Sequence, residues 1–138
     1  MKLNTYLNFG GNCREAFAFY ETHLGAKILY STTYDQMPGA SNIPPGQEKY
    51  VMHARLALGD TVIMASDVPP NMNWEPVRSA YLSLGVASDA EAERIHAALS
   101  EGAEIFMPMQ ETFYATRFSM LRDKFGINWM VIHEKPMP

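Results

Sequence analysis

Apolar and polar residues alternate through the first segment of the chain, residues 2–9. Leu3, Leu7 and Phe9 fall on one side of that alternation, and polar residues fall on the other. A period of two predicts a β-strand with one mostly apolar face. After a pair of glycines, residues 12–25 carry apolar side chains at helical spacing and end in glycine, which predicts a helix with a glycine stop.

The pattern of apolar and polar residues predicts the remaining elements in the same way. In chain order they are a β-rich stretch at 26–35, a Pro- and Gly-rich loop at 36–49, hairpin strands at 50–60 and 61–68, a turn-rich connector at 69–78, a strand at 79–86, a helix at 88–102, and strands at 103–114, 116–126 and 127–134. The order β-α-β-β-β therefore occurs twice. The predicted fold class is α+β.

Short matches between the halves indicate an internal duplication. The segments GAKIL and GAEIF, which follow the two predicted helices, are offset by 77 residues. Asn12 with Glu15, and Ser88 with Glu91, have the spacing of a capping box at each helix start, with an offset of 76. We therefore expect one domain, 1–138, built from two βαβββ modules at 1–68 and 78–138.

Composition narrows the class of protein. A net charge of −4 with scattered Lys and Arg offers no basic patch, so we expect no nucleic-acid partner. No apolar run reaches the ~20 residues of a membrane span, and the polar N-terminus is not a signal peptide, so no membrane partner is expected. The single cysteine, Cys13, excludes an intramolecular disulfide and favours a reducing compartment. We expect a soluble cytoplasmic protein.

The segments YLNFGGNCREAFAFYETHLGA, VMHARL and MPMQETFYATRFSMLRDKFGINWMV resemble the PhnB-like branch of the vicinal oxygen chelate superfamily, often named 3-demethylubiquinone-9 3-methyltransferase. This glyoxalase/bleomycin resistance/dioxygenase superfamily implies two βαβββ modules whose sheets form an open barrel with a pocket on its concave face. It also implies a homodimer. Methyl transfer is not expected, because the chain lacks the usual nucleotide-like cofactor site.

Metal-using members of that superfamily imply ligands on the first strand and on a later strand of each module. Adding the offset of 77 to His53 gives Met130, and adding it to Asn4 gives Tyr81, with Tyr6 as an alternative to Asn4. One imidazole, one thioether, one amide and one phenol make a poor site for a divalent ion. The cofactor stays unknown. A divalent metal is disfavoured, and its ligand would be His53.

His53 stands in the middle of the predicted strand at 50–60. Alternation places it with Val51, Arg55 and Ala57, opposite the apolar face that would pack on the helix. Three roles remain open: a pocket donor or base, a structural histidine, and a metal ligand. Histidine can act as acid, base or hydrogen-bond donor near neutral pH, so His53 is the candidate catalytic residue.

Candidate pocket residues come from polar strand faces and from the matched motifs. They are Tyr6, Asn8, His53, Arg55, Tyr81, Gln110, Trp129 and Met130. We expect binding of a small molecule. The alternatives are a lyase or isomerase that uses His53 as general base, with or without a divalent metal, and a non-catalytic interaction module. The length and composition of residues 36–48 suggest a lid over the pocket.

Overall fold

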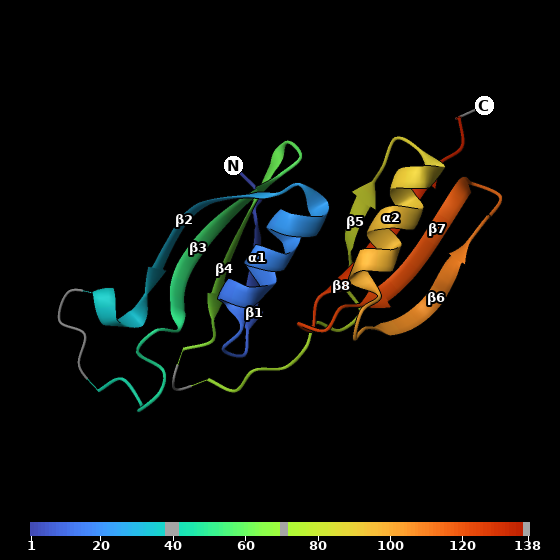
Figure 1. Ribbon diagram of the computed structural model, residues 1–138. Helices are drawn as coiled ribbons and strands as arrows, with labels where there is room; N and C mark the ends of the chain where they lie inside the picture. Colours follow the sequence, from blue (N-terminus) through green and yellow to red (C-terminus); the bar gives the residue numbers. More distant parts are fainter. Residues whose placement is uncertain (38–41, 70–71, 137–138) are drawn as a thin grey trace. The chain divides into compact units, whose positions relative to one another are not determined.

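The computed structural model describes residues 1–37, 42–69 and 72–136. The chain divides into two compact units, Met1–Glu75 and Pro76–Pro138, and each is described here by itself. In each unit the helix, α1 (Cys13–Leu24) or α2 (Asp89–Leu99), lies against the sheet of that unit (Figure 1). The middle of the loop predicted at 36–48 lies outside the described residues, and so do two residues of the predicted connector.

The first unit contains a four-stranded mixed sheet. Its elements are β1 (Thr5–Phe9), α1 (Cys13–Leu24), β2 (Lys27–Thr33), a 3-10 turn η1 (Tyr34–Gln36), β3 (Val51–Leu58) and β4 (Thr61–Asp67). The strand order is β1-β4-β3-β2. β1 runs parallel to β4, and the other pairs are antiparallel.

The second unit repeats that topology. Its elements are β5 (Leu82–Gly85), α2 (Asp89–Leu99), β6 (Glu104–Gln110), β7 (Ala115–Arg122) and β8 (Asn128–Glu134). The strand order is β5-β8-β7-β6, again with one parallel pair, β5 with β8. The predicted α+β fold with two βαβββ modules is confirmed.

The core of the first unit forms between α1 and one face of its sheet. The fully buried side chains of α1 include Phe17 and Tyr20, and those of the strands include Phe9, Leu56 and Ala65. Apolar residues at helical spacing on α1 thus meet alternate residues of the strands. Burial of this surface is the main favourable contribution to the stability of such a unit.

A buried carboxylate fixes the start of α1. Asp67, at the end of β4, is 1% exposed. Its oxygens accept hydrogen bonds from the backbone N–H groups of Gly11 at 2.9 Å, Cys13 at 3.0 Å and Val51 at 2.8 Å. One side chain therefore joins the ends of three elements, because it satisfies N–H groups of the β1–α1 turn, α1 and β3.

The two predicted helix caps differ in the structure. The Ser88 hydroxyl accepts a hydrogen bond from the Glu91 N–H at 3.1 Å and caps α2 as expected. The predicted cap at Asn12 is wrong: its side chain makes no cap hydrogen bond, and its Oδ1 is buried without a partner. Ser88 has the extended backbone conformation that is usual for a capping residue, whereas Asn12 has not, and the N–H of Cys13 at the start of α1 donates to Asp67 instead.

A β-bulge in β3 corrects the predicted alternation. Thr32 of β2 pairs with His53, but the next residue, Thr33, pairs with Val51, so Met52 is an extra residue in β3. Val51 is buried on the side of α1. His53 lies on the opposite face, so the two residues do not share a face as the alternation predicted.

The register also corrects the predicted correspondence between the modules. Arg55 pairs with Met64 in the first sheet, and Met120 pairs with Met130 in the second. Met130 lies on β8, which occupies the position of β4 in the first sheet, so it does not correspond to His53, which lies on β3. The cause is a difference in loop length: β2 and β3 are joined through residues 34–50, but β6 and β7 through 111–114.

The core of the second unit is built around Trp129. This side chain is fully buried, and its indole N–H donates to the carboxylate of Asp123 at 2.8 Å. The other oxygen of Asp123 accepts from the N–H groups of Phe125 and Ile127, which closes the β7–β8 turn.

Among the described residues, no helix is long and apolar enough to cross a membrane.

Candidate functional site

The face of the first sheet that points away from α1 carries two rows of side chains, and we call it the distal face. The pairings Tyr6–Met64, Met64–Arg55 and Arg55–Tyr30 form a continuous row across all four strands. Beside it lie the pairs Asn8–Ser66 and Thr32–His53. The distal face consists of Tyr6, Asn8, Tyr30, Thr32, His53, Arg55, Met64 and Ser66.

His53 lies between two tyrosine rings on this face. The Tyr6 hydroxyl is 3.4 Å from Nδ1 of His53, and the two rings are stacked with centroids 5.9 Å apart and an interplanar angle of 28°. The Tyr30 ring lies on the other side at a centroid distance of 6.3 Å. Tyr6 and Tyr30 are 46% and 52% exposed, so the aromatic cluster is accessible.

The contact with Tyr6 assigns different roles to the two imidazole nitrogens. When the phenol donates to Nδ1, the proton of a neutral imidazole sits on Nε2, where it is a hydrogen-bond donor. When Nδ1 carries the proton, Nδ1–H donates the hydrogen bond and the phenol oxygen accepts it. In either state Tyr6 orients the ring of His53, so the arrangement can position an acid, a base or a donor.

Arg55 supplies a cationic group beside this cluster. It lies two residues after His53 on the same face of β3, which corresponds to about 7 Å along the strand. The Arg55 side chain is exposed, and within the described part of the chain it has no ion-pair partner. A free guanidinium can bind a carboxylate or phosphate in a bidentate arrangement.

Asn8 is already engaged in the structure. Its Oδ1 accepts a hydrogen bond from the Ser66 hydroxyl at 3.1 Å, and its carbonyl oxygen accepts one from the Trp74 indole at 3.0 Å. The side-chain N–H2 of Asn8 remains as a donor at the edge of the distal face. Tyr6, Asn8, His53 and Arg55, all predicted from the sequence, thus lie together on one face.

The other four predicted residues lie in the second unit. The Tyr81 ring packs edge-on against Phe106 at a centroid distance of 6.3 Å. Met130 is half-buried beside Met120, and Gln110 is exposed at the end of β6. Trp129 has no exposed surface, so its ring belongs to the core of the second unit and presents no face on which a ligand could stack.

Four residues of the distal face were not predicted from the sequence: Tyr30, Thr32, Met64 and Ser66. Tyr30 lies next to a register shift in β2, between Ile28 and Tyr30, which breaks a simple alternation. Met64 and Ser66 share one face of β4, and the alternation of that hairpin strand was the signal that could have identified them.

The side chains around His53 do not fit a divalent metal ion. Besides the imidazole of His53, the residues of the distal face offer phenols, hydroxyls, a guanidinium, a thioether and an amide that is already bonded to Ser66, with no carboxylate and no second imidazole among them. Across the described residues, no group of three or more His, Cys, Asp or Glu side chains is arranged to hold an ion. The chemistry of the distal face is therefore that of hydrogen bonding, aromatic stacking and charge.

Comparison with known proteins places the chain among related sequences and structures. Residues 1–132 match the family described as 3-demethylubiquinone-9 3-methyltransferase. Protein YjdN from Escherichia coli K12 is 33% identical over 150 residues, covering 100% of this chain and 99% of YjdN.

Solved structures agree with this relationship. Protein PA1353 from Pseudomonas aeruginosa is 41% identical with a TM-score of 0.86, covering 99% of both chains. A putative 3-demethylubiquinone-9 3-methyltransferase, PhnB protein, from Bacillus cereus is 27% identical with a TM-score of 0.78, covering 96% of this chain and 99% of the other. The fosfomycin resistance protein FosX from Listeria monocytogenes, at 13% identity and a TM-score of 0.63 over 96% of this chain and 90% of its own, shares the fold.

Proposed function

The chain belongs to the PhnB-like 3-demethylubiquinone-9 3-methyltransferase family and has the glyoxalase/bleomycin resistance/dioxygenase fold. We propose that it binds a small molecule on the distal face of its first unit. The observation that carries this proposal is the accessible cluster of Tyr6, His53 and Tyr30 beside Arg55, whose guanidinium forms no ion pair among the described residues.

The chemistry of the cluster favours a flat molecule with an anionic group. Tyrosine and imidazole rings offer stacking surfaces, each such contact contributing about 0.5–1.5 kcal/mol beyond simple burial. Arg55 supplies a charge-assisted hydrogen bond to a carboxylate, and His53 supplies a donor or acceptor whose direction Tyr6 sets. An aromatic carboxylate satisfies all of these groups at once, so this is the proposed ligand class.

The test is a titration with 4-hydroxybenzoate as probe, followed by calorimetry and by NMR of the backbone amides. We expect saturable shifts at His53 and Arg55, and at least a tenfold weaker affinity in Arg55→Gln, which corresponds to about 1.4 kcal/mol. Tyr30→Ala should also weaken binding, because it removes one stacking surface. Arg78→Gln, an exposed arginine of the second unit, is the matched control and should bind as the wild type does.

Two results would contradict the proposal. One is an equal affinity of wild type and Arg55→Gln for the probe. The other comes from elemental analysis: stoichiometric metal in the purified wild type that is lost in His53→Ala would make His53 a metal ligand. That second result would instead support a lyase or isomerase that uses a divalent ion.

A further inference from the structure

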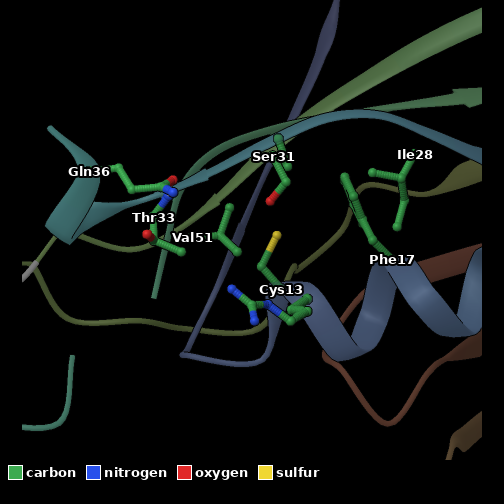
Figure 2. A pocket seen from close by; sticks show the side chains of 9 residues that line it. Cys13, Phe17, Ile28, Ser31, Thr33, Gln36 and Val51 are labelled. Atoms are coloured by element: carbon green, nitrogen blue, oxygen red, sulfur yellow. The ribbon is translucent and has the colours of Figure 1, made fainter. Parts of the chain in front are cut away.

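A cavity of about 300 Å³ lies on the opposite side of the same sheet, between α1 and the strands β2 and β3. It lies wholly within the first unit and is separate from the distal face. Figure 2 shows the side chains that surround it. They are Cys13, Arg14, Phe17, Ile28, Ser31, Thr33, Gln36, Val51 and Ala54.

The lining is divided into an apolar and a polar end. Phe17 and Ile28 close one end, whereas Thr33 and Gln36 lie at the other (Figure 2). Between these ends lie the small side chains of Ser31 and Cys13 (Figure 2), and Ala54 of β3 also lines the cavity. A ligand that fits both ends therefore has an apolar body and a polar head.

The polar end presents hydrogen-bond donors. The Oε1 atom of Gln36 already accepts from the Thr33 N–H at 3.0 Å and from the Thr32 hydroxyl at 2.8 Å, so the Gln36 amide has its N–H2 left to offer. Arg14 adds a guanidinium one turn before Phe17, and no carboxylate in the described part of the chain forms an ion pair with it. The Gln36 amide and the Arg14 guanidinium donate hydrogen bonds, so they favour a ligand whose polar group accepts them.

The charges near the cavity are otherwise compensated. The carboxylate of Asp67 is close to Cys13, but it accepts hydrogen bonds from three backbone N–H groups, which stabilise its negative charge. Asp35, beside Thr33, is paired with Lys49 at 2.8 Å. Burial and the charge of Asp67 raise the pKa of the Cys13 thiol, so Cys13 stays neutral and forms part of the apolar wall. This agrees with the position of Cys13 on the apolar stripe of the helix. Arg14 is then the cation available to a ligand.

We propose that this cavity binds a monocarboxylic acid of about ten non-hydrogen atoms, with its carboxylate toward Arg14 and Gln36 and its apolar body against Phe17 and Ile28. The size follows from the volume, because a water molecule occupies about 30 Å³ in the liquid and a methylene group about as much. Cavities of this volume are at the lower end of those that bind small ligands.

The test uses octanoate as probe in a calorimetric titration of the full chain. Arg14→Gln should weaken binding at least tenfold, and Arg78→Gln, the control, should leave it unchanged. Ala54→Leu adds three carbon atoms to the cavity wall and should abolish binding, with circular dichroism to show that the variant is folded. The neutral analogue 1-octanol should bind at least tenfold more weakly than octanoate.

NMR of the methyl groups locates the site in the wild-type protein, so the proposal can be tested even if Ala54→Leu does not fold. Octanoate should shift the methyl resonances of Ala54, Val51 and Ile28 in a saturable way and leave Ile132 of the second unit unaffected. Absence of saturable shifts at the three methyls would overturn the proposed cavity site. Equal affinity for octanol and octanoate would overturn the assignment to carboxylic acids.

Discussion

His96 is a half-buried titratable side chain that packs between α2 and β7 in the second unit. It lies on α2, and its Nδ1 is 2.9 Å from the hydroxyl of Ser119, which is fully buried on β7. Burial lowers the pKa of His96, and the nearby charge of Glu93 opposes that shift only in part. The folded unit therefore favours the neutral imidazole.

This residue gives stability a defined pH dependence. Because the pKa of His96 is lower in the folded than in the unfolded state, the unfolded chain binds more protons as the pH falls below about 6.5. Stability is therefore full above that pH and decreases as the pH falls toward the folded pKa. We expect the urea midpoint of wild type to fall between pH 7.5 and 5.5, and the slope to be smaller in His96→Gln. Identical slopes in the two proteins would contradict this role.

At the scale of elements, the two helices begin in different ways although their sequences suggest the same device. The Ser88 side chain caps α2, whereas α1 is capped by Asp67, which lies 54 residues farther along the chain than Cys13. Local spacing can predict a cap within four residues, but it carries no information about a partner that arrives from another strand. The helices themselves were predicted because their apolar periodicity is local.

The caps can be compared by substitution. Ser88→Ala should destabilise the protein by about 1 kcal/mol, because it leaves the Glu91 N–H without its acceptor. Asn12→Ala should change stability by less than about 0.5 kcal/mol, because its side chain caps nothing. Asp67→Asn should be the most harmful, by about 3 kcal/mol, since one charged acceptor serves three N–H groups.

The measurement is chemical denaturation of the four proteins in one buffer at pH 7.5. Asp60→Asn, in the exposed β3–β4 turn, is the control for loss of a carboxylate and should behave as the wild type does. An Asn12→Ala variant as unstable as Ser88→Ala would show that the Asn12 side chain caps α1 after all.

The strands show the same division between local and non-local information. Alternation placed Tyr6, Asn8, His53 and Arg55 on one face, and the structure brings these residues together. It could not reveal the bulge in β3 or the neighbour Tyr30, because both depend on how β2 pairs with β3. Met64 and Ser66 were also missed, although the alternation of β4 alone could have identified them.

At the scale of the whole molecule, the duplication is clear in the topology but uneven in the loops. Both units have the same strand order, with one parallel pair at the corresponding edge. A constant offset failed beyond the second strand of each module, because one unit carries a much longer connection at 34–50. The number of modules can therefore be predicted from the sequence. Matching individual residues between the two modules requires the pairing register of the strands.

Each unit has one tryptophan, so their stabilities can be followed separately in one sample. Trp74 is held in the first unit by its hydrogen bond to Asn8, and Trp129 is the core of the second. In protein labelled with 5-fluorotryptophan, we expect two ¹⁹F resonances. Lowering the pH from 7.5 to 5.5 should move the urea midpoint of Trp129 more than that of Trp74, because His96 belongs to the second unit.

Equal movement of both midpoints would contradict this expectation, and coincident transitions at both pH values would show that the units unfold together. Assignment of the resonances by Trp74→Phe is the control, since this substitution removes the first-unit signal without altering the buried indole of Trp129.

The extra residue in β3 has a consequence for how this sequence can change during evolution. Val51 and His53 face opposite sides of the sheet only because Met52 is accommodated as a bulge between them. Loss of the Met52 codon would leave a regular strand in which Val51 still faces α1 and His53 still faces away. Within β3, a deletion of one codon at this position would thus preserve the orientation of both neighbours. A deletion in the regular part of the strand would reverse every side chain on one side of it.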